Sequence, residues 1–188
     1  MNIFVVDKDP VIAAQSLCDK HIVKMIVESG QMLSTAHRVL DGDEWTDYGK
    51  NGRRIKRWRL KDDREDYLWK ASFVRHPCTV WTMENSINYN WHWQHAYALC
   101  KEYTSRYNKT HSSEPLIKKL RKEPDRLSII YPNSMTEFAQ AMPDKYKVKD
   151  NAVQAYRNYY NGEKSEFAKW PEGKTPDWWN PIQNLKTV

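Results

Sequence analysis

The 188-residue sequence lacks the features that mark membrane, secreted and zinc-binding proteins. Its apolar runs are only a few residues long, far short of the roughly 20 that cross a bilayer. The first ten residues include Asp7, Lys8 and Asp9 and have no basic start followed by an apolar stretch and a cleavage site. The three cysteines are an odd number at wide spacing without a C-x-x-C pair, which argues against a disulfide framework and a structural zinc site. We therefore expect a soluble protein of a reducing, cytoplasmic compartment.

Glycine and phenylalanine are also scarce. The six glycines form neither a G-x-x-x-x-G-K-[ST] nor a G-x-G-x-x-G motif, which makes a nucleotide-phosphate loop unexpected. Only four of the aromatic residues are Phe, against nine Trp and eleven Tyr, so most rings carry a polar group and suit half-buried or interface positions. Such rings can stack on nucleic acid bases, and an aromatic-rich core is the alternative explanation.

The net charge of +6 is concentrated in one part of the chain. Residues 1–49 contain four basic and eight acidic residues, whereas residues 50–75 contain ten basic and four acidic ones. Within the second stretch, Trp58 lies among seven cations with no acidic residue between them: Lys50, Arg53, Arg54, Lys56, Arg57, Arg59 and Lys61. A solvated basic face is one reading. The excess of Arg and the interleaved Trp favour binding to a nucleic acid backbone.

The hydrophobic pattern predicts a single, mainly helical domain over residues 1–188. Asp9-Pro10 is a helix start, with Asp as N-cap and Pro in the first turn, and the helix should run to about Leu40. A buried stripe is expected along one side of it, formed by Ile22, Ile26, Leu33 and Leu40. A polar row is expected on roughly the opposite side, formed by His21, Lys24, Glu28 and Gln31.

The rest of the chain predicts further helices and little strand. A second long helix should cover Thr79 to about Asn108, after His76-Pro77, because that stretch has neither Gly nor Pro. Shorter helices are expected at Glu114–Glu123, Met135–Ala141 and Lys149–Asn161, and weak strand signals at Ile3–Val6 and Leu127–Tyr131. Residues 41–75 are expected to form a basic loop with short helical pieces. The pattern leaves open whether residues 109–150 contribute to a site or form an inserted cap.

His21 and Glu28 are the first candidate site residues. Seven residues make almost two helical turns, so both side chains point the same way about 10.5 Å apart, a spacing suited to flanking one substrate. A lone helical carboxylate is usually a surface charge, so the spacing alone does not establish catalysis.

Several motifs together resemble the pyrimidine-dimer DNA glycosylases, the phage endonuclease V-like family. The stretch Leu17-Cys18-Asp19-Lys20-His21-Ile22, with Glu28 seven residues after the His, is similar to the first helix of that family. Pro77 stands where the family's long second helix begins, and Leu99-x-x-Glu102 followed by Arg106 is similar to its end. Pro176-Asp177-Trp178-Trp179 resembles the family's C-terminal aromatic segment. The resemblance spans most of the chain in order, on few identities.

The resemblance implies an all-α fold, DNA glycosylase activity and an associated abasic-site lyase activity. It assigns the nucleophile to the N-terminal α-amine, on Met1 or, after its removal, on Asn2; we expect Met1 to be retained because Asn2 is large. An α-amine has a reference pKa of about 7.7–8.0 against about 10.4 for Lys, so more of it is a free nucleophile at neutral pH. Glu28 takes the acid/base role, and His21 positions the sugar or the DNA backbone.

The same resemblance gives double-stranded DNA as the partner of a monomeric enzyme without metal or cofactor, located in the cytoplasm of the host cell if the protein is viral. Val27 and Gln31 stand where the family carries arginines that contact the lesion phosphates, and Lys24 is a candidate substitute. The candidate DNA-binding residues are Lys24, Gln31, Arg53, Arg54, Lys56, Arg57, Trp58, Arg59, Trp178 and Trp179. The last two are candidates for wedging or stacking against bases.

Three alternatives remain open from the sequence. The basic and aromatic surface could bind nucleic acid without cutting it, or the N-glycosidic chemistry could act on a modified base or a nucleotide instead of a photoproduct. His92 and His95, in a polar row with Asn85 and Asn88, could hold a metal or line a cleft, although structural hydrogen bonding is the expected role.

Overall fold

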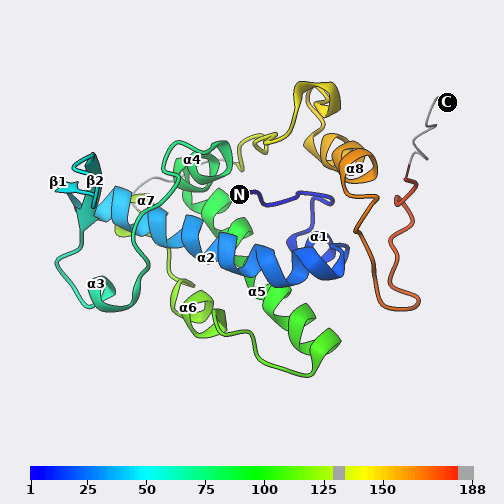
Figure 1. The fold of residues 1–188 in the computed structure, drawn as a ribbon, viewed down its shortest axis with the longest axis horizontal. Helices are drawn as coiled ribbons and strands as arrows, with labels where there is room; N and C mark the ends of the chain where they lie inside the picture. Colours follow the sequence, from blue (N-terminus) through cyan, green and yellow to red (C-terminus); the bar gives the residue numbers. More distant parts are fainter. Residues whose placement is uncertain (129–133, 182–188) are drawn as a thin grey trace.

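The computed structural model describes residues 1–128 and 134–181. Two long helices dominate it, α2 (Asp19–Asp41) and α5 (Ser86–Tyr107), which cross at the centre of the molecule (Figure 1). The other elements are α1 (Pro10–Gln15), β1 (Asp43–Tyr48), β2 (Arg54–Arg59), α3 (Arg64–Tyr67), α4 (Pro77–Glu84), α6 (Glu114–Lys119), α7 (Asp125–Ser128), the 3₁₀ helix η1 (Asp144–Tyr146) and α8 (Ala152–Glu163). The fold is mainly helical, and the two strands correct the all-α prediction.

The core lies between α2, α5, α1 and α4. Ile22, Ile26 and Leu33 are fully buried, which confirms the predicted apolar stripe of α2, whereas Leu40 at its end is only half-buried. The opposite side of α2 is covered as well, because the N-terminal residues 1–6 lie across it. His21 and Glu28 are therefore buried, and the predicted polar row does not face solvent along its whole length.

Both long helices are interrupted where the sequence predicted continuity. The first helix starts at Pro10 as predicted, with the Asp9 carboxylate accepting from two backbone N–H groups, but it breaks between Gln15 and Asp19. The N–H of Asp19 donates to the carbonyl of Lys169 instead, so a distant segment replaces the helical hydrogen bond. The second helix breaks at Asn85, whose side chain accepts from the N–H of Asn88 and caps α5.

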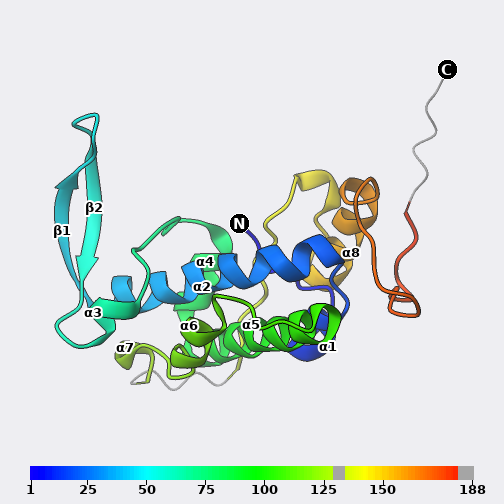
Figure 2. The same cartoon turned by 60° about the horizontal axis from the view of Figure 1, so that its bottom comes forward.

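The predicted basic loop at residues 41–75 contains an antiparallel hairpin, β1–β2. Asp43 pairs with Arg59 at its base and Tyr48 with Arg54 near its tip, and the turn holds Gly52 at a φ of 72°. Figure 2 shows the hairpin rising beyond the C-terminal end of α2, while the N-terminus lies over the middle of that helix. The hairpin was missed because none of its strand residues is buried, eight of the twelve being exposed and four half-buried, so no apolar alternation marks the strands.

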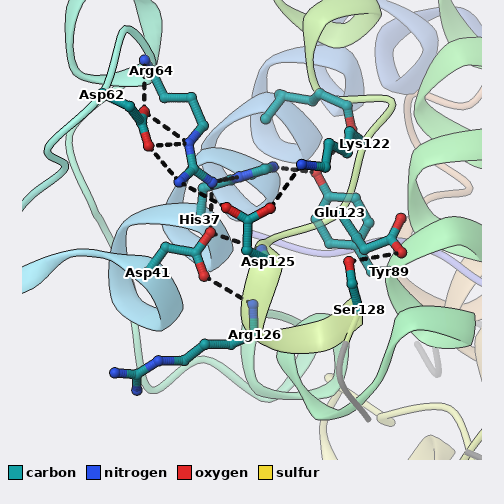
Figure 3. A network of polar contacts seen from close by, with 11 residues as sticks. His37, Asp41, Asp62, Arg64, Tyr89, Lys122, Glu123, Asp125, Arg126 and Ser128 are labelled. Carbon is teal, nitrogen blue, oxygen red and sulfur yellow. Dashed lines mark hydrogen bonds and ion pairs between the residues drawn. The ribbon is translucent and has the colours of Figure 1, made fainter. Parts of the chain in front are cut away.

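A polar network fixes the α3 segment, which follows the hairpin, to α2, α5 and α7 (Figure 3). The Arg64 guanidinium bonds Asp41 at the end of α2 and also donates to Nδ1 of His37 at 3.1 Å. Nε2 of His37 then lies 2.9 Å from the Tyr89 hydroxyl, which donates to the carbonyl of Leu120. Burial and the neighbouring Arg64 charge lower the pKa of His37 to about 4, so the ring is neutral. It accepts from Arg64 at Nδ1 and donates from Nε2 to the Tyr89 hydroxyl.

The segment 134–150 joins α7 to α8 and differs from its prediction. No helix forms over Met135–Ala141, because backbone groups there bond to other elements: the carbonyl of Thr136 accepts from the Trp81 indole, and that of Ala141 from the Asn2 amide. The predicted helix Glu114–Glu123 is present but shorter. The helix predicted at Lys149–Asn161 begins after its cap residue Asn151 and runs two residues further.

Neither predicted strand forms in the described residues. Within Ile3–Val6, Phe4 adopts a φ of 56° and the N–H of Val6 donates to the carbonyl of Phe4, which makes a tight turn. Of Leu127–Tyr131, the first two residues belong to α7 and the others lie outside the described residues. The division into one domain with a cap stays a prediction. No helix of the described chain is long and apolar enough to span a bilayer.

Candidate active site

Glu28 binds the start of the chain. Its side chain is buried in the middle of α2, and Oε2 accepts a 2.8 Å hydrogen bond from the backbone N–H of Asn2. The N-terminal nitrogen of Met1 lies 3.7 Å from the same oxygen. On the outer side, Nζ of the exposed Lys24 lies 3.4 Å from Oε1. One carboxylate therefore faces two backbone nitrogens and one ammonium group, and it brings together four of the predicted site positions.

The position of the N-terminus is fixed by contacts with two other parts of the chain, Ala141 and Thr79 of α4, and by a hydrogen bond within its own segment. The Asn2 side chain donates to the carbonyl of Ala141 at 2.8 Å and accepts from the N–H of Ile3 at 2.8 Å. The side chain of Met1 is 2% exposed, and its sulfur accepts from the Thr79 hydroxyl at 3.8 Å. Terminal residues are poorly ordered unless they are tied down. These contacts hold the amine against Glu28.

The side chain of His21, on α2, packs against this N-terminal segment. Its ring stacks on Phe4 with 4.4 Å between centroids, and Nδ1 lies 2.6 Å from the Tyr160 hydroxyl. That hydroxyl also accepts from the N–H of Cys18, so its own proton is directed to Nδ1 of His21. Burial, reinforced by the charges of Lys164 and Lys24, lowers the pKa of His21 to about 3. His21 is thus a neutral ring, and its Nδ1 is already hydrogen-bonded to Tyr160. Together with Phe4 and Tyr160 it forms the floor of the site.

The other motif residues join the two long helices. The Arg106 guanidinium, almost fully buried, bonds Glu102 at 2.8 Å and Asp19 at 2.9 Å. Lys174 of the C-terminal segment adds a 2.8 Å ion pair to Glu102. The start of α2 is therefore fixed to the end of α5, which sets the position of Glu28 about two and a half turns along.

The basic run lies on the hairpin, away from Glu28. The last residue of α2, Asp41, is thirteen residues beyond Glu28, or about 20 Å along the helix axis. Three of the cations pair with acidic residues of β1: Lys56 with Glu44, Arg57 with Asp47 and Lys61 with Asp43. Arg59 lies over the Trp45 ring and Trp58 is half-buried at the hairpin base. Across the described ranges, no acidic side chain pairs with the tip residues Lys50, Arg53 and Arg54.

Gln31 lies on α2 next to Glu28, whereas the C-terminal tryptophans lie against Tyr160. Gln31 is half-buried one turn beyond Glu28. Trp178 and Trp179 are half-buried and pack edge-on against Tyr160, at centroid distances of 5.5 and 6.1 Å. Because Tyr160 bonds His21, both tryptophans adjoin the floor of the site. They are part of an aromatic cluster, and their predicted role in stacking on bases stays a prediction.

The polar row formed by Asn85, the cap of α5, and by Asn88, His92 and His95 of α5 is buried. His92 is fully buried between the hydroxyls of Thr82 and Ser29, at 2.8 and 3.1 Å, and burial lowers its pKa to about 3. His95 is also fully buried and stacks on Trp91, but within the described residues neither of its ring nitrogens has a hydrogen-bond partner, so the expected hydrogen bonding is wrong for His95. Within residues 1–128 and 134–181, no three His, Cys, Asp or Glu side chains form a group that could hold a metal ion.

Sequence reasoning missed two residues near the amine, His76 and Cys78, and the exposed Phe73 in the loop before them. His76 caps α4, with Nδ1 accepting from the N–H of Cys78 at 3.2 Å, and its pKa is lowered by burial and by the nearby amino terminus. The Cys78 thiol lies 3.7 Å from the Asn2 side-chain oxygen, and burial raises its pKa to about 11. Phe73, three residues before His76, is exposed. The dipeptide His76-Pro77 was recognised only as a helix boundary, and nothing in the sequence singles out Phe73.

Comparison with known proteins identifies the family. No curated protein and no solved structure matches the chain. A family model described as pyrimidine dimer DNA glycosylase matches residues 1–115, which contain the N-terminus, Glu28, the hairpin and all of α5. Trp178 and Trp179 lie outside the matched range. Since the match covers more than half of the sequence and includes the helix on which the resemblance was based, the chain belongs to the pyrimidine dimer DNA glycosylase family.

Proposed function

We propose that the protein is a DNA N-glycosylase with associated abasic-site lyase activity, acting on damaged or modified pyrimidines in duplex DNA. Membership of a DNA glycosylase family supports the first activity. The observation that carries the mechanism is the position of two successive backbone nitrogens at one carboxylate oxygen: Met1 N at 3.7 Å and Asn2 N at 2.8 Å from Oε2 of Glu28.

The α-amine is the nucleophile. Its lone pair attacks C1′ of the damaged nucleotide as the C1′–N bond breaks, and the base leaves with the bonding electrons. Loss of a proton from the amine, opening of the C1′–O4′ bond and proton transfer to O4′ then give a Schiff base. Removal of a C2′ proton expels the 3′ phosphate and cuts the strand. Glu28 is the group within reach of the amine for these proton transfers.

The arrangement serves either form of the N-terminus. With Met1 retained, its amine lies 3.7 Å from Glu28. If Met1 is removed, the nitrogen of Asn2 becomes the α-amine, and it already lies 2.8 Å from the same oxygen. The Asn2 side chain keeps its bond to Ala141 in both forms. The nucleophile is therefore assigned to Met1, with Asn2 as its replacement after processing.

The DNA lies over the face of α2 that carries the N-terminus. Lys24 and Gln31 flank Glu28 and contact phosphates next to the lesion, while Arg53 and Arg54 at the hairpin tip contact the backbone further along. The other hairpin residues of the basic run are paired, stacked or half-buried and support the tip: Lys56, Arg57, Arg59 and Trp58. His21 positions the N-terminal segment from below, and Trp178 and Trp179 offer a stacking surface at the other end of the site. The proposal requires no metal or cofactor.

Borohydride trapping tests the mechanism. The protein is incubated with ultraviolet-irradiated or abasic duplexes and borohydride, which reduces a Schiff base to a stable adduct. We expect a covalent protein–DNA adduct with both substrates, lost when the α-amine is blocked, and mass spectrometry of the N-terminal peptide identifies the linked residue. Binding without an adduct on either substrate would refute the enzyme and leave a nucleic-acid-binding protein.

Glu28→Gln tests the carboxylate. The amide oxygen of Gln can still accept from the N–H of Asn2, so the fold and DNA affinity should be kept while proton transfer is lost. We expect turnover to fall about 10²- to 10⁴-fold, the usual contribution of acid–base catalysis. Glu166→Gln, at an exposed carboxylate of the C-terminal segment, is the matched control and should be fully active. Equal rates for the two variants would remove Glu28 from the mechanism.

A further inference from the structure

Phe73 combines exposure with an unfavourable backbone conformation. It lies in the loop between α3 and α4, and its side chain is 65% exposed. Its φ is 51°, in the left-handed region that bulky residues rarely adopt. A large apolar ring in contact with water and a strained backbone are both unfavourable in the free protein. Their coincidence at one residue points to a function.

The loop is held on both sides of Phe73, so the ring is presented by a fixed backbone. The N–H of Ser72 donates to the Thr35 hydroxyl of α2 at 3.0 Å. The N–H of His76 donates to the carbonyl of Phe73 at 2.9 Å. Further back, Arg38 donates to the carbonyl of Trp69 at 2.8 Å. These bonds keep the loop against α2 while the ring stays exposed.

The loop adjoins the site. Thr35, on which Ser72 rests, is seven residues after Glu28, so it lies on the same face of α2 about 10 Å along the axis. At the other end of the loop, His76 is close enough to the N-terminal amine for that charge to lower its pKa. The exposed cations Lys70 and Arg75 flank Phe73, which favours a polyanion over an apolar protein surface as the partner.

C1′ lies inside the duplex, and enzymes that act on a nucleotide there gain access by unstacking the bases around it. Apolar side chains inserted between base steps unstack them and kink the duplex. We propose that Phe73 is the wedge that enters the base stack beside the lesion and holds the duplex open while the target nucleotide reaches the N-terminal amine and Glu28. This inference rests on the proposed function. It gives the wedge to Phe73, which is free, and not to Trp178 or Trp179, which pack against Tyr160.

The test distinguishes a loss of base unstacking from a loss of catalysis and from a loss of folding. The substrate is a duplex with a thymine dimer and 2-aminopurine opposite it, whose fluorescence rises on unstacking. Phe73→Ala should lose most of that rise and cleave the dimer duplex at least tenfold more slowly in single turnover. Trapping on abasic DNA, which has no base to displace, should fall less than about threefold. Phe73→Trp should retain both signals. Ile12→Ala, at an exposed apolar residue of α1, is the control.

Phe73→Gly supplies a readout that a purely structural residue would not give. Glycine relieves the left-handed conformation, so the melting temperature should rise while unstacking is lost. Wild-type rates and fluorescence in Phe73→Ala would overturn the wedge and leave the proposed function intact. An equal loss on dimer and abasic substrates would also overturn it. If wild type unstacks the probe through Phe73 but never forms an adduct, the wedge stands and the proposed chemistry fails.

Discussion

The hairpin tip gives the sharpest prediction about DNA binding. Lys50, Arg53 and Arg54 have no acidic partner within the described chain. Three other cations, Lys56, Arg57 and Lys61, are paired with carboxylates of β1. We therefore expect the tip, and not the basic run as a whole, to contact phosphates. Replacing the three tip residues with Gln removes up to three phosphate contacts.

The magnitude follows from counterion release. Each phosphate contact contributes about 0.9 to the slope of log K against log salt, so the triple variant should have a slope smaller by up to about 2.7. Between 50 and 200 mM salt, a fourfold change, the ratio of wild-type to variant affinity for undamaged duplex should fall about 40-fold. Fluorescence anisotropy at a series of salt concentrations measures both quantities.

The control removes paired cations together with their partners. Neutralising both members of the Lys56–Glu44, Arg57–Asp47 and Lys61–Asp43 pairs takes away three cations and leaves the net charge unchanged. That variant should keep the wild-type slope. A tip variant with an unchanged slope, or a pair variant that loses as much slope as the tip variant, would refute the assignment.

Three further predictions concern the frame of the site. Tyr160→Phe should lower the free energy of unfolding by about 1–3 kcal/mol in urea titrations, because the His21 ring and the N–H of Cys18 both lose their partner. Gly30→Leu should cost about 1–3 kcal/mol, since even a Cβ at that position would lie 2.9 Å from the Trp69 ring; unchanged stability would contradict that packing. Stability should fall as pH drops below 6.5, because four buried histidines have pKa values lowered to about 3 or 4 and the unfolded chain binds protons first: His21, His37, His92 and His95. Each contributes roughly 2 kcal/mol of this loss by pH 5, so melting curves between pH 7 and 5 should move steeply; a flat profile would mean that these rings are accessible to protons.

The sequence predicted the central element well because its signals are local. Asp9-Pro10 marks a helix start by chemistry confined to one turn, and the spacing of Ile22, Ile26 and Leu33 marks the buried face. The seven-residue spacing placed His21 and Glu28 on one side of α2. The family prediction, which rested on this helix, is confirmed by the match to residues 1–115.

The missed features depend on contacts between distant segments. The break before Asp19 is made by the carbonyl of Lys169, and the loss of helix at Met135–Ala141 by bonds to Trp81 and Asn2. The hairpin is held by charge pairs across its strands and not by an apolar face, so periodicity could not find it. The burial of Glu28 under the N-terminal segment likewise depends on where residues 1–6 lie in space.

The location of the buried arginines explains which charges are left for DNA. Arg106 is bonded to two carboxylates, Arg64 to Asp41 and Asp62, and Arg38 to Glu65 and backbone carbonyls. Charges satisfied in this way fix the helices and add little to the field at the surface. The cations that remain exposed on the hairpin tip, around the Phe73 loop and beside Glu28 are few: Lys24, Lys50, Arg53, Arg54, Lys70 and Arg75. The modest net charge therefore does not limit binding, because exposed cations remain at three places where the proposed reaction needs the phosphate backbone to be held: beside Glu28, around Phe73 and at the hairpin tip.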